Sequence, residues 1–327
     1  MILRLAGLLI VALFALGASL FVGGTVISPS DLFTALLHPR AAGDIGTIVW
    51  QLRVPRIVIA GTVGAELAVA GLLLQGMLRN PLVDPYLTGV SAGAAAAITI
   101  AIVVGIAAPF IPAIGFVAGL STAVLVAALA RRGAGLDATR LILAGVSLSA
   151  LFSAIVALVL TRVQTSDYSA QILSWLAGSM AGRSWHDLAL ALPYAVGGLV
   201  LAFCAVPALN ALRIGEIRAA AVGVDVSRAQ WLILAAAALL AASAVALAGI
   251  VGFIGLIVPH LARRVVGGDV RALLPASLFI GAALCAIADA ASRALVAPAE
   301  LPIGVLLAFV GVPTFLYLYM QRERQHA

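Results

Sequence analysis

The stretch QLRVPRIVIAGTVGAELAVAGLLLQGMLRNPLVDPYLTGVSAG, residues 51–93, decides the fold class of this chain. It contains an apolar run, residues 57–78, with a single charge at Glu66. A helix of roughly 20 apolar residues is long enough to cross the hydrocarbon core of a membrane. Pro81 and Pro85 cannot continue such a helix, so the chain must turn directly after the run. The stretch therefore predicts a membrane span with a pair of arginines before it and a rigid turn after it.

The composition extends this conclusion to the whole chain. Of its 327 residues, 64% are hydrophobic and 10% are charged, and the mean hydropathy is +1.19. Soluble domains carry about 25% charged residues. The apolar runs are close to the span length of a helix and do not alternate with period two, which favours helices over a barrel. We therefore predict an all-α polytopic membrane protein in which residues 1–327 form one transmembrane domain.

About ten spans are predicted, the eighth being a short segment broken by glycine and proline. They cover residues 1–27, 57–78, 88–108, 114–130, 141–160, 188–208, 229–250, 251–266, 273–295 and 303–320. Between spans, we expect residues 170–181 to lie along the membrane interface and residues 211–228 to hold short surface helices. A weak repeat, Ala70-Gly71 before Pro81 and Ala248-Gly249 before Pro259, suggests that segments 57–160 and 229–320 are related halves.

The placement of arginines predicts that both termini are cytoplasmic, because inner loops carry an excess of positive charge. With the N-terminus inside, thirteen arginines lie inside, at positions 4, 79, 131, 132, 140, 213, 218, 228, 263, 264, 271, 322 and 324. Six lie outside, at positions 40, 53, 56, 162, 183 and 293.

The residue inventory excludes several functions. All 19 basic residues are arginine, and a Walker A loop requires a lysine that reaches the nucleotide phosphates. This chain is therefore not expected to hydrolyse ATP by that mechanism, nor to form a lysine Schiff base. Its four histidines are scattered and its two cysteines, Cys204 and Cys285, lie in apolar runs, so no metal site or disulfide is predicted.

Three polar features each have a structural and a functional interpretation. Arg53 and Arg56, with Arg293, either anchor helix ends at lipid headgroups or form a docking patch for carboxylates of a soluble partner. The loop 211–228 either anchors the inner face or fits a groove on another protein. The turn from Asn80 to Leu82 either stops a helix or closes a pathway.

Two acidic residues fall inside predicted spans. A charge in mid-span is a functional hypothesis by default, and Glu66 is the candidate here; a buried hydrogen bond or protonation in a dry site would also explain it. Asp289 lies four residues before Arg293 and is expected to pair with it on one helix face.

Seven segments together resemble one family. They are LRVPR (52–56), AGLLLQGMLRNPLVDPYLTGVSAG (70–93), TRLILAGVSLSALFSA (139–154), WLAGSMAGRSW (175–185), GEIRAAAVGV (215–224), GFIGLIVPHLAR (252–263) and ELPIGVLLAFVGVPTF (300–315). In order and spacing they closely resemble the FecCD-like permeases, the membrane subunits of bacterial type II ABC importers for iron-siderophore complexes, haem or vitamin B12. The resemblance covers nearly the whole chain.

The resemblance implies a ten-span permease of the inner membrane that forms a homodimer, with the pathway at the dimer axis. Two ATP-binding cassette subunits, which hold ATP and Mg²⁺, would bind on the cytoplasmic side, and one periplasmic substrate-binding protein would dock outside. No cofactor is expected in this chain itself.

Site residues follow from the resemblance by matching position. Arg53, Arg56 and Arg293 correspond to the docking arginines. The remaining matches are the ATPase coupling residues Gly215, Glu216, Arg218, Ala219, Ala220 and Gly223, the cytoplasmic gate residues Asn80, Leu82, Ala138 and Thr139, and the pathway-lining residues Ser147, Ser149 and Ser153.

The sequence narrows the class of substrate without identifying one compound. The segment 161–185 resembles the siderophore and haem members of the family more than the vitamin B12 members, and this resemblance favours an iron chelate, haem or a ferric siderophore, over vitamin B12. Arg162 and Arg183 at the outer face either attract anionic groups of the substrate or anchor headgroups. Two other functions stay open from the residues alone: a proton-coupled secondary transporter with Glu66 as the carrier, and a passive channel. Neither of these two functions requires a cytoplasmic loop, such as residues 211–228, that docks on a partner protein.

Overall fold

The computed structural model of the chain describes residues 1–327 except 24–26, 40–41, 134, 164–165, 298 and 325–327. Arg40, counted above among the outer arginines, lies outside the described residues. Nearly all regular structure is helical. The first half contains α1 (Ile2–Ser19), α2 (Pro29–Leu37), α3 (Gly43–Thr47), a π-helical turn η1 (Ile48–Arg53), α4 (Val54–Met77), the 3₁₀ turn η2 (Pro85–Thr88), α5 (Val90–Val104), η3 (Ala108–Phe110), α6 (Ile111–Ala130) and α7 (Ala138–Arg162). The second half contains α8 (Ser166–Leu176), α9 (Trp185–Leu212), α10 (Glu216–Ala221), α11 (Val226–Ala248), α12 (Ile254–Val266), α13 (Val270–Ala294) and α14 (Ile303–Arg324).

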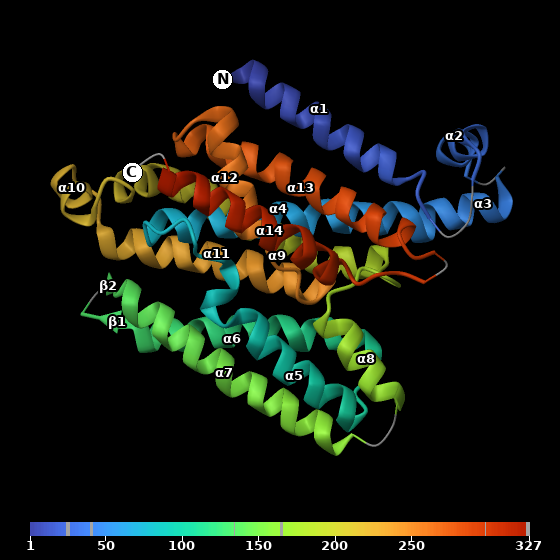
Figure 1. Cartoon of the computed structure of the whole chain (residues 1–327), viewed down its shortest axis with the longest axis horizontal. Coiled ribbons are helices and arrows are strands. Elements are labelled where there is room, and N and C mark those ends of the chain that lie inside the picture. Colours follow the sequence, from blue (N-terminus) through green and yellow to red (C-terminus); the bar gives the residue numbers. More distant parts are fainter. Residues whose placement is uncertain (24–26, 40–41, 134, 164–165, 298, 325–327) are drawn as a thin grey trace.

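The long helices run side by side in layers (Figure 1). Helix α1 lies outside α13, α13 packs on α4, α4 packs on α9 and α11, and α5, α6 and α7 form the opposite side. Within the described part of the chain, seven helices are long and apolar enough to cross a membrane. Helices α5 and α14 contribute shorter apolar segments, and α12 is a 13-residue half-span. This agrees with the prediction of about ten spans.

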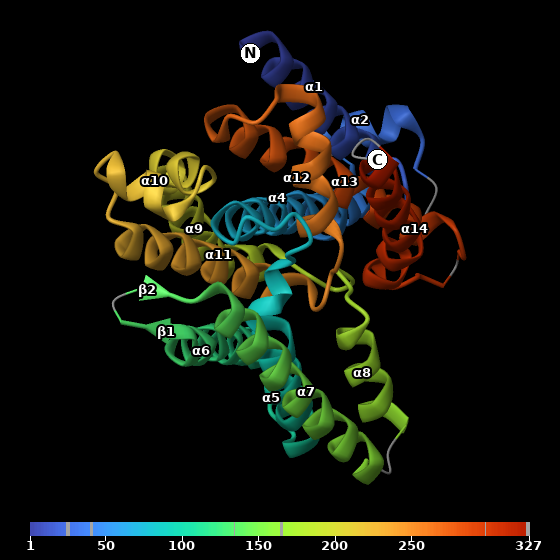
Figure 2. The same ribbon diagram turned by 60° about the vertical axis from the view of Figure 1, so that its left-hand side comes forward.

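The two ends of the layered body carry different elements. Helices α2, α3 and α8 lie at one end, called here the α8 end (Figures 1 and 2). The short helix α10 and a two-stranded hairpin, β1 (Arg131–Arg132) and β2 (Gly135–Leu136), lie at the other, called the α10 end. Helix α1 begins at the α10 end.

Helix α4 is the buried centre of the molecule. Its apolar window is 89% buried, against 17% for α1. Leu67, Leu72, Leu73 and Leu74 are among its buried side chains and join two hydrophobic clusters that connect it to α9, α11, α12 and α13. Small residues allow close packing: Gly64 on α4 meets the backbone of Gly281 on α13, as is usual for helices packed in membranes.

Three helices that leave the α10 end start with the same capping device. Asp137, Asp225 and Asp269 precede α7, α11 and α13, and each side chain accepts a backbone N–H from the first turn. An aspartate at this position satisfies an otherwise unpaired amide and interacts favourably with the helix dipole. These hydrogen bonds also hold the pKa of Asp137 and of Asp269 below the ordinary range.

The structure corrects three local expectations. The segment predicted at 170–181 is helix α8, which starts earlier, at Ser166, and ends at Leu176, before Gly178 with its positive φ of 76°. The loop 211–228 holds one short helix rather than several, since Gly215 and Gly223, both at positive φ, bound it on either side. Helix α9 continues through Pro193 and Pro207 beyond the predicted span; tightly packed membrane helices tolerate proline in this way.

Candidate functional site

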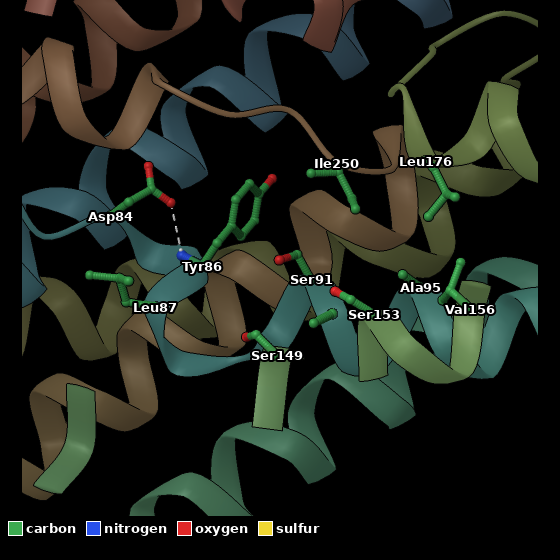
Figure 3. A pocket seen from close by; sticks show the side chains of 11 residues that line it. Asp84, Tyr86, Leu87, Ser91, Ala95, Ser149, Ser153, Val156, Leu176 and Ile250 are labelled. Atoms are coloured by element: carbon green, nitrogen blue, oxygen red, sulfur yellow. Dashed lines mark hydrogen bonds between the residues drawn. The ribbon is translucent and has the colours of Figure 1, made fainter. Parts of the chain in front are cut away.

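A cavity of about 450 Å³ lies where η2 and α5 face α7 (Figure 3). Three serine hydroxyl groups lie along it, Ser91 from α5 and Ser149 and Ser153 from α7. The other lining side chains are mostly apolar and are Leu87, Ala92, Ala95, Val156, Leu176 and Ile250, with Asp84 and Tyr86 at one end. Such a wall of small, weakly polar groups contacts a bulky solute without holding it tightly.

Helix α7 has an unusually exposed surface for a helix of this core. Only 11% of its apolar window is buried. The predicted lining residues Ser149 and Ser153 do face the cavity, whereas Ser147 is exposed on the same helix and is not among the lining residues. The cavity thus borders a helix face that this chain leaves uncovered.

The turn after α4 is held rigidly against the second half of the chain. The Asp84 carboxylate accepts the backbone N–H of Tyr86 at 2.9 Å and caps η2. The Tyr86 hydroxyl lies 3.1 Å from both the backbone N–H and the carbonyl oxygen of Val251, in the connection between α11 and α12. Asp84 and Tyr86 were not assigned to the site from the sequence, although both lie within residues 51–93, the stretch that decides the fold.

Gln75 joins the same turn to α12. Its Nε2 donates to the Gly255 carbonyl oxygen at 3.0 Å and to the Val83 carbonyl at 3.4 Å. Its Oε1 accepts from the Arg263 guanidinium at 2.9 Å. The predicted gate residue Asn80 accepts the backbone N–H of Leu82 at 2.9 Å, and Leu82 is 43% exposed. The turn that carries the two gate residues is therefore tied to α12 through the buried amide of Gln75.

Of the coupling residues predicted in loop 211–228, Gly215 and Gly223 bound α10 and Glu216 begins it. Arg218 and Ala220 are exposed, but Ala219 is fully buried. Two apolar side chains of this segment are exposed, Ile217 by 88% and Val222 by 70%, and Ile217 was not singled out from the sequence.

Gln230 connects α10 to the start of α7. Its Nε2 donates to Glu216 Oε1 at 3.2 Å, and its Oε1 accepts the backbone N–H of Leu136 in β2 at 2.9 Å. Leu136 is followed within three residues by the predicted gate residues Ala138 and Thr139, both exposed at the first turn of α7. Gln230 itself is 5% exposed. A single buried amide therefore bridges α10 and strand β2, which leads directly into the helix that lines the cavity.

At the α8 end, four charged side chains form an ion-pair cluster. Arg56 donates to Asp289 at 3.0 Å and to Glu300 at 3.0 Å. Arg293 donates to the other oxygen of Asp289 at 3.1 Å, which confirms the predicted pairing of these two residues. Asp289 is 1% exposed, so the cluster links α4, α13 and the segment before α14 inside the protein.

The three predicted docking arginines come together, but not as an open patch. Arg53 and Arg293 are each 6% exposed. Arg53 donates to the Leu20 carbonyl at 2.7 Å, and Arg293 donates to Ser19 and to the Val22 carbonyl. With Arg56, they line a cavity of about 260 Å³ at the α8 end, whose other lining residues are Gly23, Ile48, Leu52, Met180, Ala181, Gly182, Arg183 and Glu300.

Glu66 lies apart from these features. It is fully buried on α4, and its carboxylate oxygens have no hydrogen-bond partner among the described residues. It does not line the cavity beside α7. No group of three or more histidine, cysteine or acidic side chains comes together within the described part of the chain, and both cysteines are free.

Comparisons with known proteins agree on one class of protein. The model of the FecCD transport family matches residues 8–321. The chain is 36% identical over 306 residues to the ABC transporter permease YvrB of Bacillus subtilis, covering 90% of this chain and 86% of that protein. It is 36% identical to the hemin transport system permease HmuU of Yersinia pestis, covering 94% of each. It is 41% identical over 281 residues to the cobalamin import permease BtuC of Halobacterium salinarum, covering 84% of this chain and 74% of that protein.

A solved structure of the same kind has nearly the same fold. It is an inward-facing metal-chelate type ABC transporter, with a TM-score of 0.87 and 33% identity, and it covers 97% of this chain and 98% of the other.

Proposed function

The chain belongs to the FecCD transport family, and we propose that it moves an iron chelate, haem or a ferric siderophore, through a bacterial inner membrane into the cytoplasm. Its relatives are permeases of ABC importers. ATP and Mg²⁺ would be bound by a separate ATPase, because this chain has no lysine for a Walker A loop. The α10 end would be cytoplasmic and the α8 end periplasmic.

The observation that carries this proposal is the serine-lined cavity beside the uncovered face of α7. In a homodimer, a second copy would cover that face and enclose the cavity as a pathway between two α7 helices. Ser149 and Ser153 then supply weak hydrogen bonds, while Val156 and Leu176 supply apolar contact. Affinity would come from a binding protein, so the pathway itself needs only to be wide and weakly binding.

The α10 end has the features of an ATPase contact. Ile217 and Val222 are exposed apolar side chains on a short segment held between two glycines. An exposed apolar helix of this kind fits a groove on a partner protein. The predicted coupling residues Arg218 and Ala220 lie exposed on the same segment. Movement of α10 would reach the gate residues at the start of α7 through Gln230.

The α8 end has the features of a docking site for a binding protein. Its cavity gathers Arg53, Arg56 and Arg293, and arginine pairs with carboxylates in bidentate geometry. Because Arg56 already holds Asp289 and Glu300, an incoming carboxylate would compete with the exposed Glu300, whose side chain is 39% exposed. Docking would thus loosen a contact that ties α4 to the segment before α14.

The choice of an iron chelate rests on the relatives. They include permeases for hemin, Fe(3+)-citrate and iron(3+)-hydroxamate. Cobalamin is the alternative substrate, since permeases for it are also similar over most of their length. The cavity is compatible with both because its lining contains no feature specific to one ligand.

The test is uptake into proteoliposomes that contain this chain with its cognate ATPase. The cognate binding protein is supplied outside, loaded in turn with haem, a ferric siderophore or cobalamin. We expect ATP-dependent accumulation of haem or of the siderophore. Accumulation of cobalamin alone would show that cobalamin is the substrate, and it would still support an ATP-driven importer.

Accumulation without ATP would contradict the proposal as a whole. A proton gradient that drives uptake in the absence of ATP, and loss of that uptake in Glu66→Gln, would support a secondary transporter instead.

A further inference from the structure

A cavity between α6, α9 and α11 plays no part in the proposed pathway. Its volume is about 200 Å³, and no described residue of α7 lines it. On each of the three helices, its lining residues recur at the three- and four-residue spacing of one helix face. They are Pro112, Ala113, Phe116 and Val117 of α6, Asp187, Leu190, Ala191 and Tyr194 of α9, and Ser243, Ala246 and Leu247 of α11.

The cavity opens to the surroundings of the helices rather than to the protein interior. Three of its lining side chains, Val117, Leu190 and Tyr194, are 60%, 52% and 44% exposed. Helices α6 and α9 are both long enough to span the membrane, and less than half of the apolar window of each is buried. An exposed apolar face within a membrane span contacts lipid acyl chains. The cavity is therefore open to the hydrocarbon of the membrane.

The cavity lies toward the α8 end of the molecule. Helices α6 and α9 lead into β1 and α10, so their first turns, which line the cavity, lie at the opposite end. Trp185 begins α9, and its Nε1 donates to the Trp50 carbonyl oxygen at 2.7 Å. Tryptophans are enriched at the headgroup level of membranes. Asp187, two residues further along α9, therefore lies where the headgroups meet the acyl chains.

Asp187 offers a charged acceptor at this level. Its Oδ2 accepts from the backbone N–H of Ser184 at 2.9 Å and from the Ser184 hydroxyl at 2.8 Å. Its Oδ1 lies 3.7 Å from the Arg183 guanidinium, beyond hydrogen-bonding distance, and the side chain is 20% exposed. Because a carboxylate oxygen accepts more than one hydrogen bond, Oδ1 can accept from a cationic group at the mouth of the cavity.

Tyr194, two turns further into the membrane, supplies a second polar group. Its ring packs against Phe116, with 4.3 Å between the ring centroids. Its hydroxyl has no hydrogen-bond partner in the part of the chain that the structure describes. Seven residues span about 10 Å along a helix, and a helical side chain leans toward the N-terminus of its helix. The hydroxyl therefore lies between the depths of Tyr194 and Asp187, where phospholipids carry ester carbonyl groups.

We propose that this cavity binds one phospholipid whose headgroup ends in a primary ammonium, as in phosphatidylethanolamine. The ammonium group donates to Asp187, an ester carbonyl accepts from the Tyr194 hydroxyl, and an acyl chain fills the apolar space beside Ala246 and Leu247. A choline headgroup has no N–H to donate, and the carboxylate of Asp187 repels an anionic headgroup. The bound lipid would hold the starts of α6 and α9 against the end of α11.

The test measures lipid binding to the permease–ATPase complex after removal of native lipid in detergent. Native mass spectrometry counts the molecules retained as phosphatidylethanolamine, phosphatidylcholine or phosphatidylglycerol is titrated. We expect one phosphatidylethanolamine per permease chain, bound about tenfold more tightly than the other two. Asp187→Asn keeps an acceptor for the cap but removes the charge, and should lower this affinity to that for phosphatidylcholine. Asp44→Asn, at an exposed aspartate of the same end, is the control and should leave it unchanged.

A steric block tests the cavity itself. Ala113 is exposed beside the cavity, so Ala113→Leu fills the space without displacing the core and should abolish lipid retention. Ala128→Leu, at an exposed position of α6 outside the cavity, is the matched control. Tyr194→Phe keeps the ring and removes the donor, and should weaken binding about threefold. A phosphatidylethanolamine with a photoreactive acyl chain should label residues 112–117 and 190–194.

The outcomes decide between this site and other occupants. Equal affinity of the unaltered protein for phosphatidylethanolamine and phosphatidylcholine, or full retention in Ala113→Leu, would overturn the site. Labels confined to α1 or α7 would do the same. If Ala113→Leu instead releases a permease chain from the complex, the cavity is an interface between copies and the inference is wrong. The importer is tested separately by uptake, and this lipid site does not depend on the transported substrate.

Discussion

At the scale of single residues, a few buried polar groups hold distant parts of the chain together. Asp289 accepts from two arginines, one of them 233 positions away in the sequence. Each of the three charges is largely withdrawn from water, so the cluster is stable only while all its members are present. The same logic applies to Gln75, whose amide satisfies three groups from two segments, the turn after α4 and helix α12.

Asp289→Asn should destabilise the protein markedly. Two buried guanidinium groups would lose their shared negative charge, and removing one partner of a buried pair costs about 3 kcal/mol or more. Thermal unfolding in detergent, followed by tryptophan fluorescence, measures the effect. Asp225→Asn is the control, because its partner Arg228 is 89% exposed and asparagine caps a helix equally well. Equal thermal midpoints for Asp289→Asn and Asp225→Asn would contradict the prediction that the ion-pair cluster stabilises the protein.

At the scale of elements, close helix contacts depend on glycines, which have no side chain, as much as on the side chains that pack. Gly71 on α4 faces the backbone of Gly255 at the start of α12, and a Cβ atom there would overlap the carbonyl oxygen of Gly255. This contact brings the half-span α12 against the centre of the molecule, next to the Gln75 hydrogen bonds. The backbone cannot move away without breaking them.

Gly71→Ala should lower stability by about 1–3 kcal/mol, the usual cost of overpacking a well-packed interior. Gly7→Ala on α1 is a matched control, because a Cβ there meets no atom within 4 Å. Alanine is also the better helix former, so the control should be neutral or slightly stabilising. The comparison uses thermal midpoints of both variants in one detergent. A stable Gly71→Ala protein would mean that α4 and α12 separate easily.

Gln230→Leu should uncouple the two activities of the complex. Leucine occupies a similar volume but cannot bridge Glu216 and Leu136, so movement of α10 would no longer be passed to α7. We expect ATP hydrolysis to continue while uptake falls about tenfold. Arg228→Gln, one half-turn earlier and exposed, is the control and should leave the ratio of uptake to hydrolysis unchanged. A parallel fall of hydrolysis and uptake would indicate a general structural role instead.

At the scale of the whole molecule, the proposed pathway requires a second copy of the chain. Its serine-lined cavity borders α7, most of which is exposed, while the buried centre of the fold lies at α4. Helix α1 is also exposed but lies on the opposite side of the layers (Figure 1). The face of α7, rather than that of α1, therefore carries the polar groups expected at a shared axis.

Two copies should cross-link through α7. In a Cys204→Ala background, Ser153→Cys should give a covalent dimer with a short bismaleimide, because the two α7 helices would face each other across the pathway. Phe14→Cys on α1, 76% exposed, should remain monomeric under the same conditions. Mobility on denaturing gels measures the result. Dimers that form through α1 and not through α7 would contradict the proposed interface.

The sequence alone determined the class of the protein and most of its elements. Apolar runs of span length, prolines and glycines at their ends, and arginine placement act locally, so they predict most long helices within a few residues of those observed. The exception is the first span, predicted over residues 1–27, whereas α1 ends at Ser19. The pairing of Asp289 with Arg293 was also predictable, because both lie one turn apart on the same helix. The assignment to the permease family followed from ordered motifs along nearly the whole chain.

Only the tertiary structure decided which polar groups meet. Nothing in the local pattern places Gln230 between α10 and β2, or brings Arg183 to the cavity that Arg56 lines, because these arrangements join segments far apart in the chain. The hydropathy of a residue type indicates how often it is buried, but not which group forms its hydrogen bonds in the fold. The burial of Arg53 and Arg293 has the same origin: their positions next to span ends predict exposure, whereas packing of α1 and α13 encloses them and supplies their hydrogen-bond acceptors.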